Sequence, residues 1–269
     1  MLYVIASPIG NLEDMTFRSV KTLEQVDLIF CEDTRVTKKL LNHYNISKPL
    51  IRYVDDETKQ DFYLEKIKNN DVALISDAGT PLFSDPGYKI VKIAIENHIM
   101  VSPLPGASAL MTALSITGKN ISNFLFEGFF PKLNSNQKLL LSKLRYTTYD
   151  SFFFESPKRV NKTLKLLKDN LVDRHIIIFH ELTKLNEKII HINLKEQINF
   201  ELINKGEYVI LISGAGSPKQ HIDEDFKKYV KSEMEYMLQN GLSLKNATKI
   251  ISEIFDLPRK GIYNIWIDK

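Results

Sequence analysis

The sequence predicts two α/β domains that face each other across a cleft, followed by a small helical unit at the C-terminus. In the first 117 residues, short apolar runs alternate with segments of helical period, an order typical of a mostly parallel sheet. Most of these runs end in loops rich in glycine, proline or polar residues. Because open α/β sheets bind ligands outside the carboxyl ends of their strands, such loops indicate a binding site.

The first domain, residues 1–117, is predicted to contain five strands separated by helices. Its apolar runs are Leu2–Ala6, Leu28–Cys31, Leu50–Tyr53, Val72–Ile75 and Ile99–Ser102. Helices are expected through Val26, from Asp33 or Thr34 to Tyr44, around Lys59–Asn69, after Gly87, and from Ala107 to Ala113. Asp14 or Thr16 is expected to cap the first helix, and Asp33 or Thr34 the second.

The second domain, residues 118–217, repeats this alternation. Its predicted strands are Phe124–Glu127, Ser151–Phe154, His175–His180, Lys188–Ile192 and Glu207–Ile212. Its predicted helices are Ser135–Arg145, a Leu/Lys amphipathic segment ending at Asn170, and a segment near Leu194–Asn204. Ser213–Pro218 is interpreted as a linker, because it is rich in glycine, serine and proline.

The last part of the chain, residues 218–269, is predicted to form three helices. They lie near Asp223–Gln239, Ser243–Phe255 and Arg259–Trp266, and short turns with glycine or proline separate them. This order is typical of a helix-turn-helix-like unit. Its net charge is only +1, so the sequence leaves nucleic-acid binding by this unit open.

Positive charge is concentrated in one stretch of the chain. The formal net charge is +3, but residues 131–168 carry +7 and the remainder sums to −4. Five cations of this stretch are candidate contacts for an RNA backbone: Lys132, Arg145, Lys158, Arg159 and Lys162. The alternative is a pair of solvated helices in a lysine-rich protein, and the sequence does not choose between the two.

Composition and motifs exclude several classes of protein. Cys31 is the only cysteine, so neither an internal disulfide nor a thiolate zinc site can form. No apolar run approaches the roughly 18 residues of a membrane-spanning helix, and no signal peptide is apparent, so a soluble cytoplasmic protein is expected. The sequence also lacks the usual motifs of dinucleotide sites, phosphate-binding loops, zinc proteases and serine hydrolases.

The loop Ser76–Gly87 is the most distinctive binding candidate. It follows the buried run Val72–Ile75, and its two glycines and two prolines fix an unusual backbone path. Comparable loops follow the first strand at Ser7–Asn11 and the fifth at Pro103–Gly106. The alternative for each loop is a tight strand-to-helix turn in which Asp and Ser serve as caps.

An ordered set of motifs resembles the ribosomal RNA small subunit methyltransferase I family, a branch of the tetrapyrrole (corrin/porphyrin) methylases. In the first half the matching motifs are Pro8–Leu12, Glu32–Arg35, Ser76–Pro81 with Asp85–Gly87, and Pro103–Gly106. In the second half they are Glu127–Phe129, Phe154–Ser156 with Arg159, Glu181–Lys184, and Gly206–Glu207. The resemblance covers essentially the whole chain. Tyr53–Thr58 departs from it, because the family commonly has histidine and asparagine in this segment.

The resemblance implies an enzyme that uses S-adenosylmethionine to methylate the ribose 2′-hydroxyl of a cytidine in 16S ribosomal RNA. It also implies a homodimer, and a methyl donor bound in the cleft between two α/β domains of the tetrapyrrole-methylase type. By motif, the donor site would comprise Ile9, Gly10, Gly79, Thr80, Phe83, Ser108, Ala109, Phe154, Leu182 and Ser213.

Methyl transfer to a sugar hydroxyl depends first on alignment of the acceptor oxygen behind the methyl group, and positioning alone can supply about 7–11 kcal/mol. Because this hydroxyl is a poor nucleophile at neutral pH, a nearby base or cation would assist. The candidate catalytic residues are Asp33, Arg35, Glu155, Glu181 and Lys184, with no metal required. Each of them could instead form an interdomain salt bridge, so their individual roles stay open.

Two other functions remain compatible with the sequence. A superfamily relative would methylate a tetrapyrrole or a protein side chain, although the +7 stretch and the helical tail favour an RNA substrate. A non-catalytic RNA-binding module would have no affinity for S-adenosylmethionine, which distinguishes it from both enzymes.

Overall fold

A computed structural model of the chain describes residues 1–171, 173–196, 201–215, 224–255 and 257–268. Their contacts form two compact units. The first comprises Met1–Gly118 together with Phe179–Lys188, and the second comprises Lys119–Ile178 and Ile189–Lys269. A short segment from the second half of the sequence therefore belongs to the first unit.

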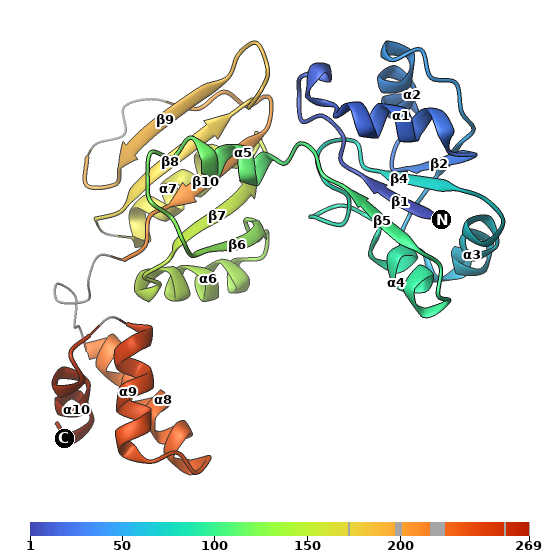
Figure 1. Ribbon diagram of the computed structural model, residues 1–269. Coiled ribbons are helices and arrows are strands. Elements are labelled where there is room, and N and C mark those ends of the chain that lie inside the picture. The colour runs from blue at the N-terminus through green and yellow to red at the C-terminus, as the bar shows by residue number, and fades with distance from the viewer. Residues whose placement is uncertain (172, 197–200, 216–223, 256, 269) are drawn as a thin grey trace. The chain divides into compact units, whose positions relative to one another are not determined.

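The first unit is a five-stranded parallel sheet with helices on both faces (Figure 1). The strand order is β3-β2-β4-β1-β5, and all four pairs of neighbours are parallel. The strands are β1 (Leu2–Ile5), β2 (Leu28–Cys31), β3 (Leu50–Arg52), β4 (Val72–Ile75) and β5 (Val101–Leu104). The helices are η1 (Leu12–Asp14), α1 (Phe17–Gln25), α2 (Thr34–His43), η2 (Glu57–Lys59), α3 (Gln60–Asn69), α4 (Tyr88–Glu96) and α5 (Ala109–Ser115). The predicted parallel α/β fold is confirmed.

Side chains of successive strand residues point to opposite faces of this sheet, as the two-residue period of a strand requires. On one face Ile29 and Ile75 join a core cluster with residues of α1 and α2. On the other face Phe30 and Leu74 join a cluster with residues of α3 and α4. Both faces are covered, which explains why the central strands are continuous apolar runs rather than alternating ones.

Strand β5 lies two residues further along the chain than predicted. The sequence favours Ile99–Ser102, because Pro103 has no backbone N–H to donate to a ladder. The structure places Pro103 inside β5, opposite Val4 of β1. This is possible because β5 is an edge strand, and an edge strand needs hydrogen-bond partners on one side only.

The second unit contains a mixed five-stranded sheet of order β6-β7-β10-β8-β9. Strand β7 pairs in parallel with β6 and antiparallel with β10. The strands are β6 (Phe124–Phe129), β7 (Asp150–Glu155), β8 (His175–His180), β9 (Lys188–Asn193) and β10 (Tyr208–Ile212). Helices α6 (Asn134–Tyr146) and α7 (Val160–Asn170) pack against this sheet through a cluster that includes Leu144 and Leu164. A second α/β sheet, as predicted, is present.

Ser213–Ala215 is not a linker, contrary to the sequence interpretation. Ser213 Oγ donates a hydrogen bond to the His175 carbonyl over 2.7 Å, and Ala215 N donates to the Thr147 carbonyl over 2.7 Å. A Cβ at Gly214 would overlap the Thr148 carbonyl. The glycine therefore permits close backbone packing rather than flexibility. Residues 216–218 of the predicted linker lie outside the described residues, as do residues 197–200 of the helix predicted near Leu194–Asn204. The described residues of that segment, 194–196 and 201–204, are turn or irregular, so the helix prediction is wrong for them. Leu194 N donates to the Arg174 carbonyl and Leu202 N to the Asn161 side chain, so distant residues satisfy these backbone groups.

Three C-terminal helices follow, as predicted. They are α8 (Glu224–Gln239), α9 (Leu244–Ile254) and α10 (Arg259–Ile267). They share a core cluster of their own, which includes Phe226, Met234 and Ile262. Tyr146 of α6 packs against this cluster, with its ring centroid 5.4 Å from that of Phe226. No helix among the described residues is long and apolar enough to span a membrane.

Candidate active site

The carboxyl ends of four strands of the first unit lie at one edge of its sheet. Ile5, the last residue of β1, is in register with Ile75 of β4 and Leu104 of β5, and Cys31 of β2 is in register with Ile75. The loops that follow these strands therefore emerge side by side. The sequence predicted this for the loops after β1, β2, β4 and β5, and the strand register confirms it.

Hydrogen bonds join three of these loops into one surface. Ser7 and Gly79 form an isolated antiparallel bridge, with N···O distances of 2.8 and 3.0 Å. The Ser7 hydroxyl donates to the Ser76 carbonyl over 2.9 Å, and Thr80 Oγ1 donates to the Ala107 carbonyl over 3.3 Å. The predicted donor residues of the β1, β4 and β5 loops are thus held together within the first unit.

Gly79 has a backbone conformation that only glycine adopts readily. Its φ is +75°, and a Cβ at this position would lie 3.5 Å from Ile9 Cγ2 and 3.9 Å from the Ala107 carbonyl. Leu82 and Ser84 in the same loop also have positive φ values, 71° and 69°. Non-glycine residues in this region are strained by about 1–3 kcal/mol each, and such strain clusters at functional sites.

The segment Phe179–Lys188 brings residues from the second half of the chain to the loop after β1. A Cβ at Gly10 would overlap the Lys184 side chain and lie 3.0 Å from Thr183 Oγ1. Lys184 Nζ forms an ion pair with Glu181 Oε1 over 2.7 Å. Glu181 and Thr183 have positive φ values of 55° and 65°, so this segment is strained as well.

The hydroxyl of Thr183 is a further candidate for the site, which the sequence prediction did not name. Its Oγ1 is buried and has no hydrogen-bond partner among the described residues. Buried hydroxyls are rarely left without a partner, so this one fits a polar ligand beside Gly10. Thr183 lies inside the motif Glu181–Lys184, between the predicted residues Leu182 and Lys184, and this position in the motif could have identified it from the sequence.

Asp33 and Arg35 form a local ion pair at the start of α2. The Asp33 carboxylate accepts a hydrogen bond from Arg35 N over 2.8 Å, and its Oδ2 lies 2.6 Å from Arg35 Nη2. Arg35 thereby holds the pKa of Asp33 well below its ordinary value. Asp33 is the N-cap of α2, one of the two caps that the sequence allowed. A carboxylate with a lowered pKa is a weak proton acceptor.

Two neighbouring carboxylates at the same edge are shifted in the opposite direction. Burial raises the pKa of Asp77, and burial together with the charge of Asp77 raises the pKa of Glu32. Asp77 Oδ1 also accepts a hydrogen bond from Asp33 N over 3.0 Å, which ties the loop after β4 to the loop after β2. Both groups favour the protonated state more in the folded chain than in the unfolded one.

We expect Asp77→Asn to raise the melting temperature at pH 7. Asparagine keeps an oxygen that can accept from Asp33 N but carries no charge to desolvate. The raised pKa of Asp77 in the folded chain means that its charge destabilises the wild type at neutral pH. This destabilisation disappears as the pH falls through the folded-state pKa to the lower pKa of the unfolded chain, because Asp77 is then protonated in both states. The advantage of the variant should therefore shrink on acidification toward pH 4. Thermal unfolding between pH 4 and 8 tests this, with the exposed Asp169→Asn as control; an advantage independent of pH would contradict it.

Glu155 and Arg159 form a buried ion pair inside the second unit. The Glu155 side chain is fully buried and lies 2.6 Å from Arg159 Nη2. It also accepts hydrogen bonds from Ser156 N and from Thr163 Oγ1, each over 2.6 Å. Arg159 in turn donates to the Phe130 carbonyl over 3.0 Å. These contacts hold the turn between β7 and α7, so this salt bridge lies within one unit.

The ten predicted donor residues divide between the two units. Eight of them, including Leu182, belong to the first unit. Phe154 and Ser213 belong to the second unit, where Phe154 packs against Phe126 with centroids 4.9 Å apart. Ser213 accepts from His175 N over 3.0 Å and donates to the His175 carbonyl.

The segment that departs from the family motif, Tyr53–Thr58, caps helix α4. Helix α4 has Gly87 as its N-cap and therefore no capping side chain of its own. Asp55 supplies the missing acceptor, with 3.2 Å contacts from its carboxylate oxygens to Gly87 N and Lys89 N. Tyr53 Oη donates to Asp55 over 2.6 Å and accepts from Ile90 N over 3.1 Å. These residues thus position the end of the Ser76–Gly87 loop.

The cations predicted to contact RNA are not equivalent in the structure. Lys132, Arg145, Lys158 and Lys162 are exposed, whereas Arg159 is partly buried and paired with Glu155. Lys158 and Lys162 lie near the start of α7, one turn apart. The four exposed cations are accessible to a polyanion, whereas Glu155 holds the guanidinium of Arg159.

Comparison with known protein families matches residues 1–198 to the tetrapyrrole (corrin/porphyrin) methylases. Several relatives carry the name ribosomal RNA small subunit methyltransferase I. The one from Halalkalibacterium halodurans is 37% identical over 98% of this chain and 94% of its own length. The one from Bacillus subtilis is 35% identical over 99% and 94%, and the one from Thermotoga maritima is 40% identical over 79% and 98%.

Solved structures of similar fold include the methyltransferase CobJ, with a TM-score of 0.58 and 15% identity over 80% of this chain and 94% of that one. A diphthine synthase has the same TM-score and 13% identity over 79% of this chain and 89% of its own. At these identities the likeness concerns the fold alone.

Proposed function

The chain belongs to the tetrapyrrole (corrin/porphyrin) methylases and, within them, to the ribosomal RNA small subunit methyltransferase I family, and from this membership we propose its function. It is an S-adenosylmethionine-dependent methyltransferase whose substrate is RNA of the small ribosomal subunit. The acceptor is the ribose 2′-hydroxyl of a cytidine. Identity of 35–37% over nearly the full length of the named relatives is the observation that carries this proposal.

The loops at the carboxyl edge of the first sheet would hold the donor. Gly79 is buried and holds the loop after β4 against Ser7, and the Thr183 hydroxyl is buried beside Gly10 without a hydrogen-bond partner among the described residues. The remaining donor residues are those predicted from the motifs: Ile9, Thr80, Phe83, Ser108, Ala109 and Leu182, with Phe154 and Ser213 from the second unit. When bound, S-adenosylmethionine supplies a methyl group on a positively charged sulfur.

Among the candidate catalytic residues, Glu181 and Lys184 have the best support. The Lys184 side chain lies against Gly10, one of the predicted donor residues. Because Lys184 Nζ pairs with Glu181, the Glu181 carboxylate lies close to the predicted donor site. We assign Glu181 to take up the proton of the acceptor hydroxyl and Lys184 to stabilise the developing negative charge. Asp33 and Glu155 are less suited, because each is already held by an arginine and by backbone N–H groups.

Two measurements test the proposed function. Calorimetric titration with S-adenosylmethionine and with its demethylated product should show saturable binding of both. Mass spectrometry of small-subunit RNA from a strain without the protein should show the loss of one 2′-O-methylcytidine. If every such mark remained, the RNA substrate would be wrong; if the donor did not bind, a non-catalytic RNA-binding module would replace the enzyme. Methylation of a tetrapyrrole or protein side chain would be favoured by donor binding with intact RNA marks.

Reversing two charges on α7 should weaken RNA binding without affecting the donor. Lys158→Glu with Lys162→Glu removes two exposed cations, and each lost single-strand phosphate contact should lower the salt slope by about 0.7. RNA affinity measured from low to high salt checks this. Lys21→Glu with Lys68→Glu makes the same charge change at exposed positions of the first unit and serves as control. An equal loss of RNA affinity in both double variants would show that the overall charge matters and that the α7 lysines do not contact the RNA.

A homodimer, which the family resemblance implies, and a cytoplasmic location, which the sequence composition favours, complete the proposal. Sedimentation of the purified protein at micromolar concentration should give the mass of two chains of 31.0 kDa each. A single-chain mass across that range would contradict the dimer. Cell fractionation tests the location.

A further inference from the structure

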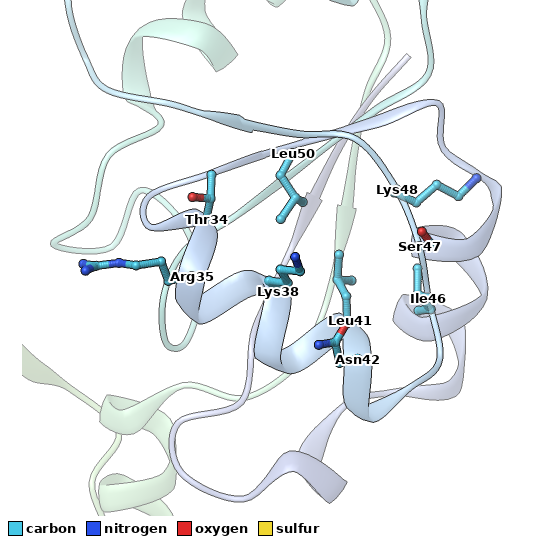
Figure 2. A pocket seen from close by; sticks show the side chains of 9 residues that line it. All are labelled: Thr34, Arg35, Lys38, Leu41, Asn42, Ile46, Ser47, Lys48 and Leu50. Atoms are coloured by element: carbon cyan, nitrogen blue, oxygen red, sulfur yellow. The ribbon is translucent and has the colours of Figure 1, made fainter.

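A pocket outside the predicted donor residues lies between helix α2 and the residues that follow it. It has a volume of about 430 Å³ and is lined by Thr34, Arg35, Lys38, Leu41, Asn42, Ile46, Ser47, Lys48 and Leu50. Figure 2 shows the side chains of α2 on one side and those of Ile46–Leu50 on the other. This volume is at the lower end of the range of small-molecule sites and suits a ligand about as large as one nucleotide.

The floor of the pocket is apolar and fixed by the end of α2. Asn45 adopts a left-handed φ of 57°, and Ile46 N donates to the Leu41 carbonyl over 2.9 Å. This hydrogen bond across the helix end is the Schellman motif, in which the two flanking side chains also touch. Leu41 and Ile46 are both buried in the same core cluster. The floor is therefore held in place by the core, and the partly exposed Leu50 adds apolar surface to it.

The rim of the pocket is polar and positively charged. Asn42 and Ser47 carry donors and acceptors, and Lys38 and Lys48 add two cations. No carboxylate lines the pocket in the described part of the chain, and no ion pair described there involves either lysine. Arg35 extends away from the other labelled side chains (Figure 2) and pairs with Asp33 over 2.6 Å, so Lys38 and Lys48 are the pocket cations without a described ion pair.

We propose that this pocket binds one nucleotide of the RNA substrate, with the base on the apolar floor and its phosphate near Lys38 and Lys48. The inference rests on the proposed function. Single-stranded RNA is recognised mainly through bases splayed out of the stack, whose edges form hydrogen bonds with side chains such as Asn42 and Ser47. Thr34 belongs both to the pocket and to the polar run Glu32–Arg35 after β2. The pocket is thus continuous with the edge that carries the candidate active site.

A matched pair of charge reversals tests this site. Lys38→Glu places a carboxylate in the pocket, whereas Lys39→Glu makes the same change at the next residue, which is exposed and does not line the pocket. With intact small subunits from a strain without the protein, Lys38→Glu should raise KM for RNA about tenfold and lower its salt slope by about 0.7. Lys39→Glu should leave both near the wild-type values. Donor affinity by calorimetry should be unchanged in both variants.

A second measurement examines the base. Asn42→Ala with Ser47→Ala removes hydrogen-bonding groups without changing charge and should also raise KM for RNA. Ultraviolet cross-linking of the wild-type protein to the same subunits, followed by peptide mass spectrometry, should attach a nucleotide within residues 40–48. Equal KM values for Lys38→Glu and Lys39→Glu, or no cross-link in this segment, would overturn the inference. The inference would also be overturned if free cytidine triphosphate bound saturably and Lys38→Glu weakened this binding but left KM for RNA unchanged.

The two proposals fail in different ways. If the wild-type protein transferred no methyl group to small-subunit RNA, the proposed function would be wrong. If it did so and the pocket variants matched the wild type, only the nucleotide site would be wrong.

Discussion

Replacing Gly79 by valine is expected to abolish donor binding, with no saturable heat in a titration of S-adenosylmethionine up to millimolar concentration. Gly79 has a φ of +75°, and its backbone pairs with Ser7 across the bridge that joins the loops after β1 and β4. A β-branched residue is strained in this region, and its Cβ alone would already touch Ile9 Cγ2 at 3.5 Å. The strain of a positive φ, together with the valine methyl groups beyond Cβ, is therefore expected to shift the loop and the surface it shares with Ala107.

Gly241→Val is the control for the strain of a positive φ. Gly241 has a φ of +85°, and a Cβ there would meet nothing within 4 Å. Both variants should lose stability by at least about 1–2 kcal/mol, the cost of a left-handed side chain. Only Gly79→Val should lose the donor. If Gly79→Val bound S-adenosylmethionine as the wild type does, the donor site would have to lie elsewhere.

Replacing Glu155 by alanine is expected to destabilise the protein by about 3–5 kcal/mol, the usual cost of removing one partner of a buried ion pair. The change leaves the guanidinium of Arg159 and the hydroxyl of Thr163 without this acceptor in a buried site. Chemical unfolding measures the effect. Glu253→Ala, at an exposed carboxylate near Lys249, should change the denaturation midpoint little, because exposed pairs contribute little.

Glu155→Gln separates a structural role from a catalytic one. Glutamine keeps the shape and an acceptor oxygen but cannot take up a proton. At a temperature where the variant is folded, kcat should stay close to the wild-type value while the melting temperature falls. A loss of kcat by two orders of magnitude or more, typical of a missing general base, with unchanged stability would instead make Glu155 catalytic.

Patterns within the sequence predict most of the secondary structure because they depend on local chemistry. Runs such as Leu28–Cys31 and Val72–Ile75 are continuously apolar because both faces of their parallel sheet are covered, and this pattern predicts buried strands. Thr16 and Asp33 cap the helices that follow them, as their side-chain oxygens favour. The three C-terminal helices begin and end within one or two residues of their predicted limits.

Two differences between the prediction and the structure concern proline and glycine, whose local preferences are overridden by a neighbouring part of the chain. Pro103 suggested a loop, but an edge strand tolerates it because one side of the strand has no partner. Gly214 suggested a linker, but it packs against the Thr148 carbonyl, where no side chain would fit. In both cases the neighbouring chain decides, and that neighbour is distant in the sequence.

The alternation of strands and helices, the motifs of a methyltransferase family and the loops that carry them can all be read from the order of residues along the chain. The pairing of the charged residues becomes visible only once the chain is folded. Asp33 is held by Arg35, Glu155 is buried with Arg159, and Glu181 lies with Lys184 beside Gly10. The physical reason is that a motif fixes the order of residues along the chain, whereas burial, ion pairing and pKa shifts depend on neighbours that only folding brings within a few ångströms.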